Sequence, residues 1–288
     1  MEMDRKLGFR VFRATVKYLS GKGLTKLPLV RKTYHLLGKH LIGEGIVPVD
    51  VCGQKMYADL SFRLMLLPTG TYERMTTNLF TKLVTEGMIV IDIGANIGYY
   101  TLLAAKAVGN NGRVFCFEPE PSNYALLLKN IKENNHGNVT PVKKAVTNTT
   151  GVVKLFISKE PGQHSIASDN LHQRAISVDS TTLDDFFVGK EYPIHAIKMD
   201  IEGAELATFQ GMRNIIAKNP QLVIFTEFNP RCLMMAGASP TEYFQMLINY
   251  GFKIHAIDEQ KQSLEPAELG HIMKRCKGIE TVNLLCQR

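Results

Sequence analysis

The sequence predicts an α/β protein with a Rossmann-like, doubly wound sheet of seven strands, mostly parallel with an antiparallel end strand, and helices on both faces. The main observation is that strand-like apolar segments alternate with helical segments from residue 88 to residue 258. Such alternation is typical of parallel strands joined by crossover helices. Two closing strands, at 252–258 and 281–287, lack a helical pattern between them, which predicts the antiparallel pairing. With 288 residues, 45% of them apolar, the chain can bury one large core.

The elements follow from local patterns. Residues 46–60 alternate as a hairpin with its turn at Gly53-Gln54, and 71–87 form a helix ended by Gly87. The seven strands of the sheet are expected at 88–93, 112–120, 139–146, 194–201, 221–229, 252–258 and 281–287. The helices that join them are expected at 97–108, 121–135, 180–187, 204–219 and 239–251. A further strand at 151–158 breaks the alternation and marks an insertion.

We expect three parts: a basic amphipathic helical arm at 1–45, a hairpin and helix at 46–86, and the main α/β domain at 87–288. Residues 1–40 hold ten Lys or Arg against two Asp or Glu, and the remainder holds 24 against 25. The net charge of +7 therefore belongs to the arm.

The arm is expected to begin with a helix that Gly21 and Gly23 end. At 100° per residue, one stripe of this helix is basic: Lys6, Arg10, Arg13 and Lys17. The adjacent side is apolar: Phe9, Phe12, Val16 and Leu19. Two interpretations stay open. Residues 1–22 contact an anionic membrane surface peripherally, or the helix packs on the domain with its charges in water.

Composition points to a cytoplasmic protein, at most peripheral at the inner membrane face. No apolar run approaches the roughly 20 residues of a membrane helix, and no secretory leader is expected. The five cysteines form no C-x-x-C pair, which is typical of a reducing compartment without structural zinc or disulfides. Nucleic acid is not an expected partner, because no stacking motif or recognition helix stands out.

The turn "DIGANIG" at 92–98 links the first strand of the sheet to its helix, where an open α/β sheet binds ligands. Glycines allow close backbone approach, and the helix N-terminus favours negative charge. The dinucleotide pattern G-x-G-x-x-G fails here, because Asn96 and Tyr99 stand where glycines are required. Asp92 instead favours a ligand with a cationic amine beside a carboxylate, as in the methionine part of S-adenosylmethionine.

Glu118 ends the second strand, 24 residues after Gly94, and Glu120 follows it. A carboxylate there can accept both ribose hydroxyls of a nucleoside. The alternative is an ordinary solvated acid at a helix entry. We assign these residues to the cofactor site: Asp92, Gly94, Ala95, Asn96, Gly98, Tyr99, Thr101, Glu118, Pro119 and Ala145.

Five segments resemble the FkbM family of S-adenosylmethionine-dependent methyltransferases. They are "VIDIGANIGYYTLLAA", "FEPEPSNYALLLKNI", "TTLDDF", "IKMDIEGAELATFQGM" and "IFTEFNP". The resemblance runs from about residue 72 to about residue 259 and leaves 1–45 uncovered. It implies a class I methyltransferase fold and methyl transfer to oxygen, with a hydroxyl acceptor on a small molecule or glycan: a sugar, glycolipid or secondary metabolite. Tyr72 and Glu73 resemble a family element ahead of the core that lines the acceptor pocket.

Methyl transfer to a hydroxyl requires alignment and removal of the hydroxyl proton. Our catalytic candidates are Asp200, Glu202, Glu227 and His164. The first two end and follow the fourth strand, Glu227 ends the fifth, and His164 lies in a polar loop of the insertion. Lys198 shares a sheet face with Asp200, and its burial would demand a carboxylate partner. The alternative for these acids is decoration of a helix N-terminus, and Glu205 is the weakest candidate among them.

A metal site is a further interpretation, since Asp200, Glu227 and Asn229 offer oxygen ligands at neighbouring strand ends. The resemblance does not require a metal, and none is assigned. Two other classes of function remain as alternatives. One is a nicotinamide-dependent oxidoreductase, which Asn96 and Tyr99 argue against; the other is a non-catalytic module that keeps the fold as a scaffold.

Overall fold

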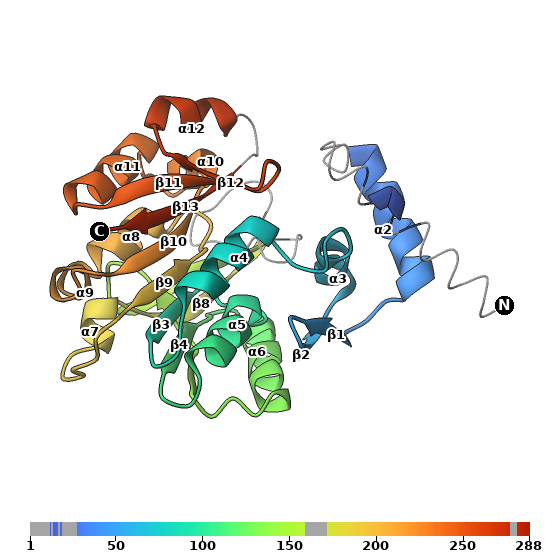
Figure 1. The fold of residues 1–288 in the computed structure, drawn as a ribbon, viewed down its shortest axis with the longest axis horizontal. Helices are drawn as coiled ribbons and strands as arrows, with labels where there is room; N and C mark the ends of the chain where they lie inside the picture. Colours follow the sequence, from blue (N-terminus) through green and yellow to red (C-terminus); the bar gives the residue numbers. More distant parts are fainter. Residues whose placement is uncertain (1–11, 13, 17, 19–27, 159–171, 277–280) are drawn as a thin grey trace.

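A computed structural model describes residues 12, 14–16, 18, 28–158, 172–276 and 281–288. Its centre is a sheet of eight strands in the order β12-β11-β13-β10-β9-β3-β4-β5, which confirms the α/β class (Figure 1). The strands of this sheet are β3 (Ile89–Ile93), β4 (Arg113–Phe117), β5 (Val139–Val142), β9 (Ala196–Met199), β10 (Val223–Phe228), β11 (Lys253–Asp258), β12 (Ser263–Pro266) and β13 (Val282–Gln287).

The sheet is parallel from β10 through β9, β3 and β4 to β5, and β13 runs antiparallel to both of its neighbours. The two closing strands β11 and β13 pair antiparallel as expected, and this end of the sheet is antiparallel, but β13 lies between β10 and β11. The edge is formed by β12, a strand that the sequence prediction lacks and that pairs with β11 in a hairpin. A short helix, α12 (Leu269–Arg275), was likewise not expected between the closing strands.

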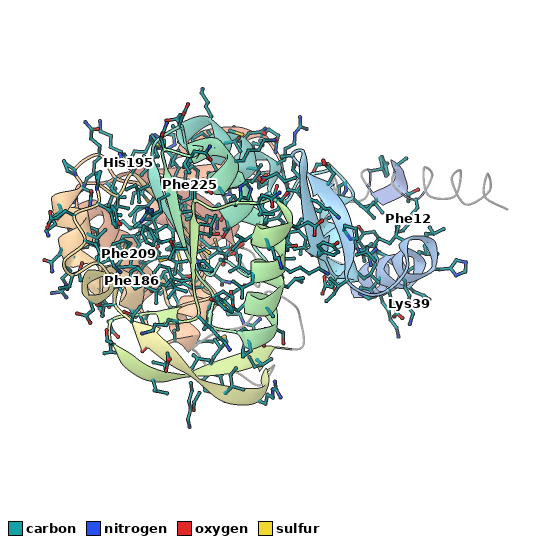
Figure 2. The ribbon with its side chains drawn as sticks, turned by 90° about the horizontal axis from the view of Figure 1, so that it is seen from below. Phe12, Lys39, Phe186, His195, Phe209 and Phe225 are labelled. Atoms are coloured by element: carbon teal, nitrogen blue, oxygen red, sulfur yellow. The ribbon has the colours of Figure 1, made fainter. Side chains whose placement is uncertain are left out.

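Helices cover both faces. One face packs against α4 (Arg74–Leu83), α5 (Tyr99–Val108) and α6 (Pro121–Glu133). The other packs against α7 (Leu183–Phe186), α8 (Glu205–Gln210), α9 (Arg213–Lys218), α10 (Pro230–Met235), α11 (Pro240–Asn249) and α12. Phe209 is buried on the second face and Phe225 on the first, and both lie inside the main body in Figure 2.

A small second sheet follows β5, in the order β6-β8-β7, and corresponds to the expected insertion. Its strands are β6 (Ala145–Val146), β7 (Gly151–Ser158) and β8 (His172–Thr181). The helix expected over 204–219 is two helices, α8 and α9, and Gly211 is the residue that ends α8.

The hairpin of β1 (Val47–Val51) and β2 (Gln54–Ala58) joins the arm to the domain. It is fixed to α6 by Asn130, which is fully buried and exchanges hydrogen bonds with the backbone of Tyr57. Asn130 also donates to the carbonyl of Ile97 in the glycine turn at 2.8 Å. One buried amide therefore connects hairpin, helix and turn.

The arm contains α2 (Pro28–Ile42), which packs on α3 (Leu60–Leu66) beside the main body (Figure 1). Phe12 and Val16 are buried in a cluster with Leu60 and Leu64, and Figure 2 shows Phe12 at the arm end of the molecule. This burial favours the packing interpretation for that helix side. The basic stripe Lys6, Arg10, Arg13 and Lys17 lies outside the described residues. Among the described helices, none is long and apolar enough to cross a bilayer.

Candidate active site

The candidate site lies where the parallel strands β4, β3, β9 and β10 end side by side. Because the carboxyl ends of parallel strands meet at one edge, residues far apart in the sequence come together there. The glycine turn follows β3, Glu118 follows β4, Asp200 follows β9, and Glu227 lies near the end of β10.

The glycine turn is held against β4 and passes over the end of β9. The amides of Gly94 and Ala95 donate to the carbonyl of Phe117 at 3.0 and 2.9 Å. Gly94 has φ of 77°, and a Cβ added there would lie 2.0 Å from the carbonyl oxygen of Asp200. Glycine is therefore required at position 94 because the backbone of Asp200 occupies the space of a side chain. Asn96, with φ of 52°, and Gly98, with φ of 101°, complete the turn into α5.

Glu118 is tied into this turn. Its side chain is buried, and its two oxygens accept the amides of Asn96 and Glu120, each at 2.8 Å. Burial raises the pKa of Glu118 to about 7, while these two amides act in the opposite direction. The cap of α6 is Glu120, which accepts the amide of Asn123. Glu118 is therefore not the solvated helix-entry acid of the alternative interpretation.

Asp92 lies beneath the turn. Its side chain is 2% exposed, and Oδ2 accepts the hydroxyl of Thr101 at 2.6 Å. Burial raises the pKa of Asp92 to about 6, against the hydrogen bond from Thr101. On the neighbouring strand β9 the residue in register with Asp92 is Lys198. The buried hydroxyl of Tyr99 accepts the amide of Tyr72 at 3.1 Å, which links α5 to the segment before α4.

The other predicted site residues are placed less centrally. Ala95 is buried against α6, and Pro119 is half-buried between Glu118 and α6. Ala145 lies in β6 and is buried in the core of the small sheet with Leu155 and Val178. His164 lies outside the described residues. His195 is at the amino end of β9, where its Nδ1 accepts the amide of Ile89, away from the site edge.

The acidic candidates gather around one buried lysine. Lys198 is 1% exposed, and its Nζ lies 3.3 Å from Oδ2 of Asp200, so the expected pairing is present. Burial alone would lower the pKa of Lys198, but the charges of Asp200, Glu73 and Glu227 raise it overall. The lysine is therefore charged, and its ammonium also lies 4.9 Å from the centre of the Tyr100 ring.

Glu202 and Glu227 in this cluster resist ionisation. Burial raises the pKa of Glu202 to about 7, with Asp200 adding to the effect. Burial also raises the pKa of Glu227 well above its usual range, and Asp200 and Glu202 contribute. One oxygen from each of Asp200, Glu202 and Glu227 lies within 4.8 Å of the others. The edge therefore combines the positive charge of Lys198 with a carboxyl group, that of Glu202, whose pKa of about 7 lets it exchange a proton near neutrality.

Sequence reasoning missed Tyr100, which completes the wall of the cluster. Its hydroxyl donates to Glu73 at 2.9 Å, and burial raises the pKa of Glu73 while Lys198 lowers it. Glu73 has φ of 43°, an uncommon conformation for this residue. No sequence signal marks Tyr100, because the first turn of α5 is buried on all sides.

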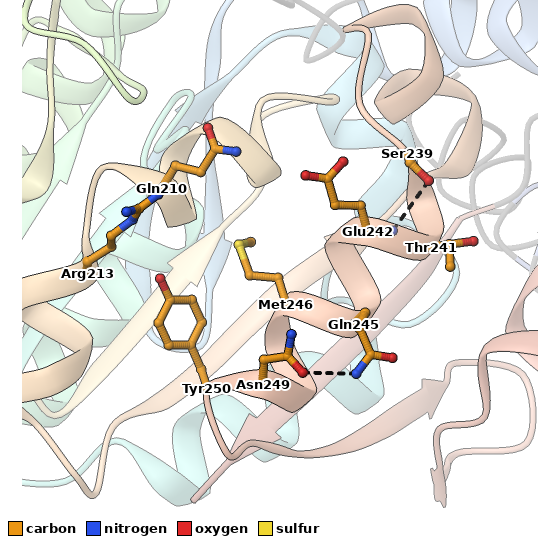
Figure 3. Close-up of a pocket in the computed structure, with 9 residues that line it drawn as sticks. All are labelled: Gln210, Arg213, Ser239, Thr241, Glu242, Gln245, Met246, Asn249 and Tyr250. Atoms are coloured by element: carbon orange, nitrogen blue, oxygen red, sulfur yellow. Dashed lines mark hydrogen bonds between the residues drawn. The ribbon is translucent and has the colours of Figure 1, made fainter.

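A separate open groove of about 760 Å³ lies between α11 and the start of α9 (Figure 3). None of the predicted site residues lines it. Most of the residues that line it have polar side chains: Gln210, Arg213, Ser239, Thr241, Glu242, Gln245, Met246, Asn249 and Tyr250.

Comparison with known proteins finds similarity in the α/β domain that carries this site. The family model of the methyltransferase FkbM domain matches residues 92–254. A hexuronic acid methyltransferase, AglP, from Haloferax volcanii is 25% identical over 151 residues, which are 50% of this chain and 58% of that protein. Methyltransferase 1 from Beauveria bassiana is 23% identical over 148 residues, 44% of this chain and 59% of that protein. The chain thus spans less than two thirds of the length of these relatives.

Among solved structures, a putative transferase from Pyrococcus horikoshii has a TM-score of 0.47 at 14% identity, covering 91% of this chain and 85% of that one. An O-methyltransferase from Bacillus cereus, solved with S-adenosylhomocysteine, has a TM-score of 0.44 at 13% identity, covering 75% and 80%. Likeness at this level does not transfer an activity.

Proposed function

This chain belongs to the methyltransferase FkbM domain family, and on that premise we propose that it transfers the methyl group of S-adenosylmethionine to a hydroxyl of a sugar, glycolipid or secondary metabolite. The observation that carries the proposal is Glu118, a buried carboxylate joined to the glycine turn at the carboxyl edge of the sheet. The match to the hexuronic acid methyltransferase supports a sugar-type acceptor.

The polar groups around the glycine turn fit a nucleoside that carries an amino acid. Each oxygen of Glu118 accepts one backbone amide, and a carboxylate oxygen has two acceptor positions, so one on each remains for the two ribose hydroxyls. The N-terminus of α5 favours the carboxylate of the methionine part. Asp92 supplies negative charge for its amine. The bound sulfonium supplies an activated methyl group.

The chain's own task is to position the acceptor and take its proton. Asp200 and Glu202 stand across the edge from Glu118 and would accept hydrogen bonds from the acceptor hydroxyl. Lys198 holds Asp200 in place through the 3.3 Å contact. Glu227 adds a second carboxyl group from β10. These acids can hold the hydroxyl and receive its proton as the methyl group leaves sulfur.

A transfer assay tests the proposal. The full chain is incubated with methyl-labelled S-adenosylmethionine and with separate glycan, lipid and small-metabolite pools. We expect label in an alkali-stable, ether-type product of at least one pool and none with the Glu118→Ala variant. Calorimetry complements it: S-adenosylhomocysteine should bind and NAD should not. Binding of NAD alone would favour the oxidoreductase alternative, and donor binding without turnover in any pool would favour the non-catalytic one.

A further inference from the structure

We propose that Asp200, Glu202 and Glu227 form a binding site for a divalent cation. One oxygen of each side chain lies within 4.8 Å of the other two. Ligands on opposite sides of a calcium ion, each at 2.3–2.6 Å, are about 4.6–5.2 Å apart. Three oxygens no farther apart than this can face one cation of that size from neighbouring strand ends. This inference does not rest on the proposed function.

A second observation, a buried acid without a hydrogen-bond partner, also supports a cation near these three carboxylates. Glu205, the first residue of α8, is fully buried, and neither of its oxygens has a hydrogen-bond partner of good geometry among the described residues. Oε2 of Glu227 is also buried without such a partner. Buried polar atoms are ordinarily paired, so orphaned ones call for an ion or water.

Electrostatic coupling relates Glu205 to the cluster. Burial raises the pKa of Glu205 to about 8, and the charges of Glu202 and Asp200 add to this effect. The carboxyl group of Glu205 is therefore close enough to interact electrostatically with a cation bound by Asp200, Glu202 and Glu227, and to stabilise it.

The charge balance also favours a cation. Asp200, Glu202, Glu205 and Glu227 bring four carboxyl groups to this edge, whereas Lys198, 3.3 Å from Asp200, is the cation paired with them. Burial of several like charges is costly unless an opposite charge or a metal compensates them. The side chain of Asp200 is 28% exposed, which gives an ion access.

The ligand set differs from Asp200, Glu227 and Asn229, the three oxygen ligands that the sequence suggests. Oδ1 of Asn229 accepts the amide of Cys232 at 3.1 Å and caps α10, so that oxygen is engaged in the fold. Glu202 takes its place. Three carboxylates favour a hard cation such as Mg²⁺, Ca²⁺ or Mn²⁺ over zinc. A cation there would also lower the pKa of a hydroxyl that coordinates it.

Mn²⁺ is the probe. Free Mn²⁺ is titrated with the full chain, without donor or acceptor, and followed by its paramagnetic resonance signal. We expect about one bound Mn²⁺ per chain, with affinity at least tenfold weaker in Glu227→Gln and in Asp200→Asn. The matched control is Glu242→Gln, an acid in the first turn of α11 outside the cluster, which should bind as the wild type does.

A second readout covers variants that fold poorly. The chain has no tryptophan, so Tb³⁺ luminescence must be excited through tyrosine. Tyr72 is the expected sensitiser, because the charges of Asp200, Glu227 and Glu202 reach it. Excess Ca²⁺ should quench the signal of the wild type, and Tyr72→Phe should reduce it severalfold. Absence of Mn²⁺ binding to the wild type, or equal affinity in the control and cluster variants, would overturn the site. Methyl transfer unaffected by chelators would leave the proposed function standing.

Discussion

Glu118 accepts the backbone amide of Asn96 at 2.8 Å, which ties the end of β4 to the turn that follows β3. One acid thus organises the turn and, in the proposed function, accepts the ribose hydroxyls. Since the carbonyl oxygen of a Gln can still accept the Asn96 amide, and only the bond from the Glu120 amide is lost, substitution can test the two roles apart.

Glu118→Gln should weaken binding of S-adenosylhomocysteine by about 1.5–3 kcal/mol, or roughly 10- to 150-fold, because hydrogen bonds to a charged acceptor are lost. Calorimetry measures the affinity and thermal unfolding checks the fold. Glu133→Gln, at the end of α6, serves as the control and should bind normally. An affinity equal to that of the wild type would remove Glu118 from the cofactor site.

The same affinity should depend on pH. The pKa of Glu118 in the free protein is raised to about 7 by burial, whereas the bound ribose favours the ionised form. Binding of S-adenosylhomocysteine should therefore weaken as the pH falls below about 7, by up to tenfold per pH unit. Titrations between pH 8 and pH 5.5 measure this. In Glu118→Gln the dependence should become shallower, and only the contribution of Asp92, with its pKa of about 6, should remain. A parallel pH dependence in both proteins would contradict the assignment.

The stability of the protein without ligand should depend on pH in the opposite direction from ligand binding, and should fall as the pH rises. A raised pKa in the folded state means that Glu118 destabilises the fold once it must ionise. Its contribution is most favourable below its unfolded value of about 4.5 and is lost as the pH rises to about 7. The free energy of unfolding of the wild type, measured with urea, should fall more steeply across this window than that of Glu118→Gln. Equal slopes would show that Glu118 is not strained by burial.

Gly94→Ala should destabilise the protein far more than Gly87→Ala. Both glycines have positive φ, 77° and 80°, so both variants carry the backbone cost of about 1–2 kcal/mol. Only at Gly94 would the new Cβ meet a backbone oxygen, that of Asp200 at 2.0 Å, while nothing lies within 4 Å at Gly87. We expect a loss of at least about 4 kcal/mol for Gly94→Ala, measured by urea unfolding. Similar losses in both variants would mean that the turn can move away from β9.

The sequence predicts most of the sheet because its strands and helices alternate with clear periodicity. It misses β12 and α12, since four- and seven-residue elements are too short to show a period. The place of β13 between β10 and β11 depends on pairing between residues as distant as Ile224 and Cys286, which no local pattern records. The antiparallel direction was predictable, but the position in the sheet was not.

For the site, the residues at strand ends could be named in advance because topology alone brings them to one edge. The contacts of Tyr100 with Glu73 and Lys198 depend on how α5 is rotated against the sheet. The role of Asn229, in contrast, could be predicted from the sequence. The pair Asn229-Pro230 is typical of a helix start, and this signal explains its capping role better than metal ligation does.

Lys198→Met tests the buried ion pair. Removing one partner of a buried pair typically costs about 3–5 kcal/mol, and partial exposure of Asp200 places this case near the lower end. We therefore expect a loss of about 3 kcal/mol in the free energy of unfolding and a larger loss of methyl transfer than of donor binding. The control is Lys261→Met, because Lys261 pairs with Asp258 and Glu265 but is 67% exposed, which predicts less than about 1 kcal/mol. If both variants lost the same stability while Lys198→Met kept full turnover, Lys198 would be a packing residue with no part in holding Asp200 at the acceptor edge.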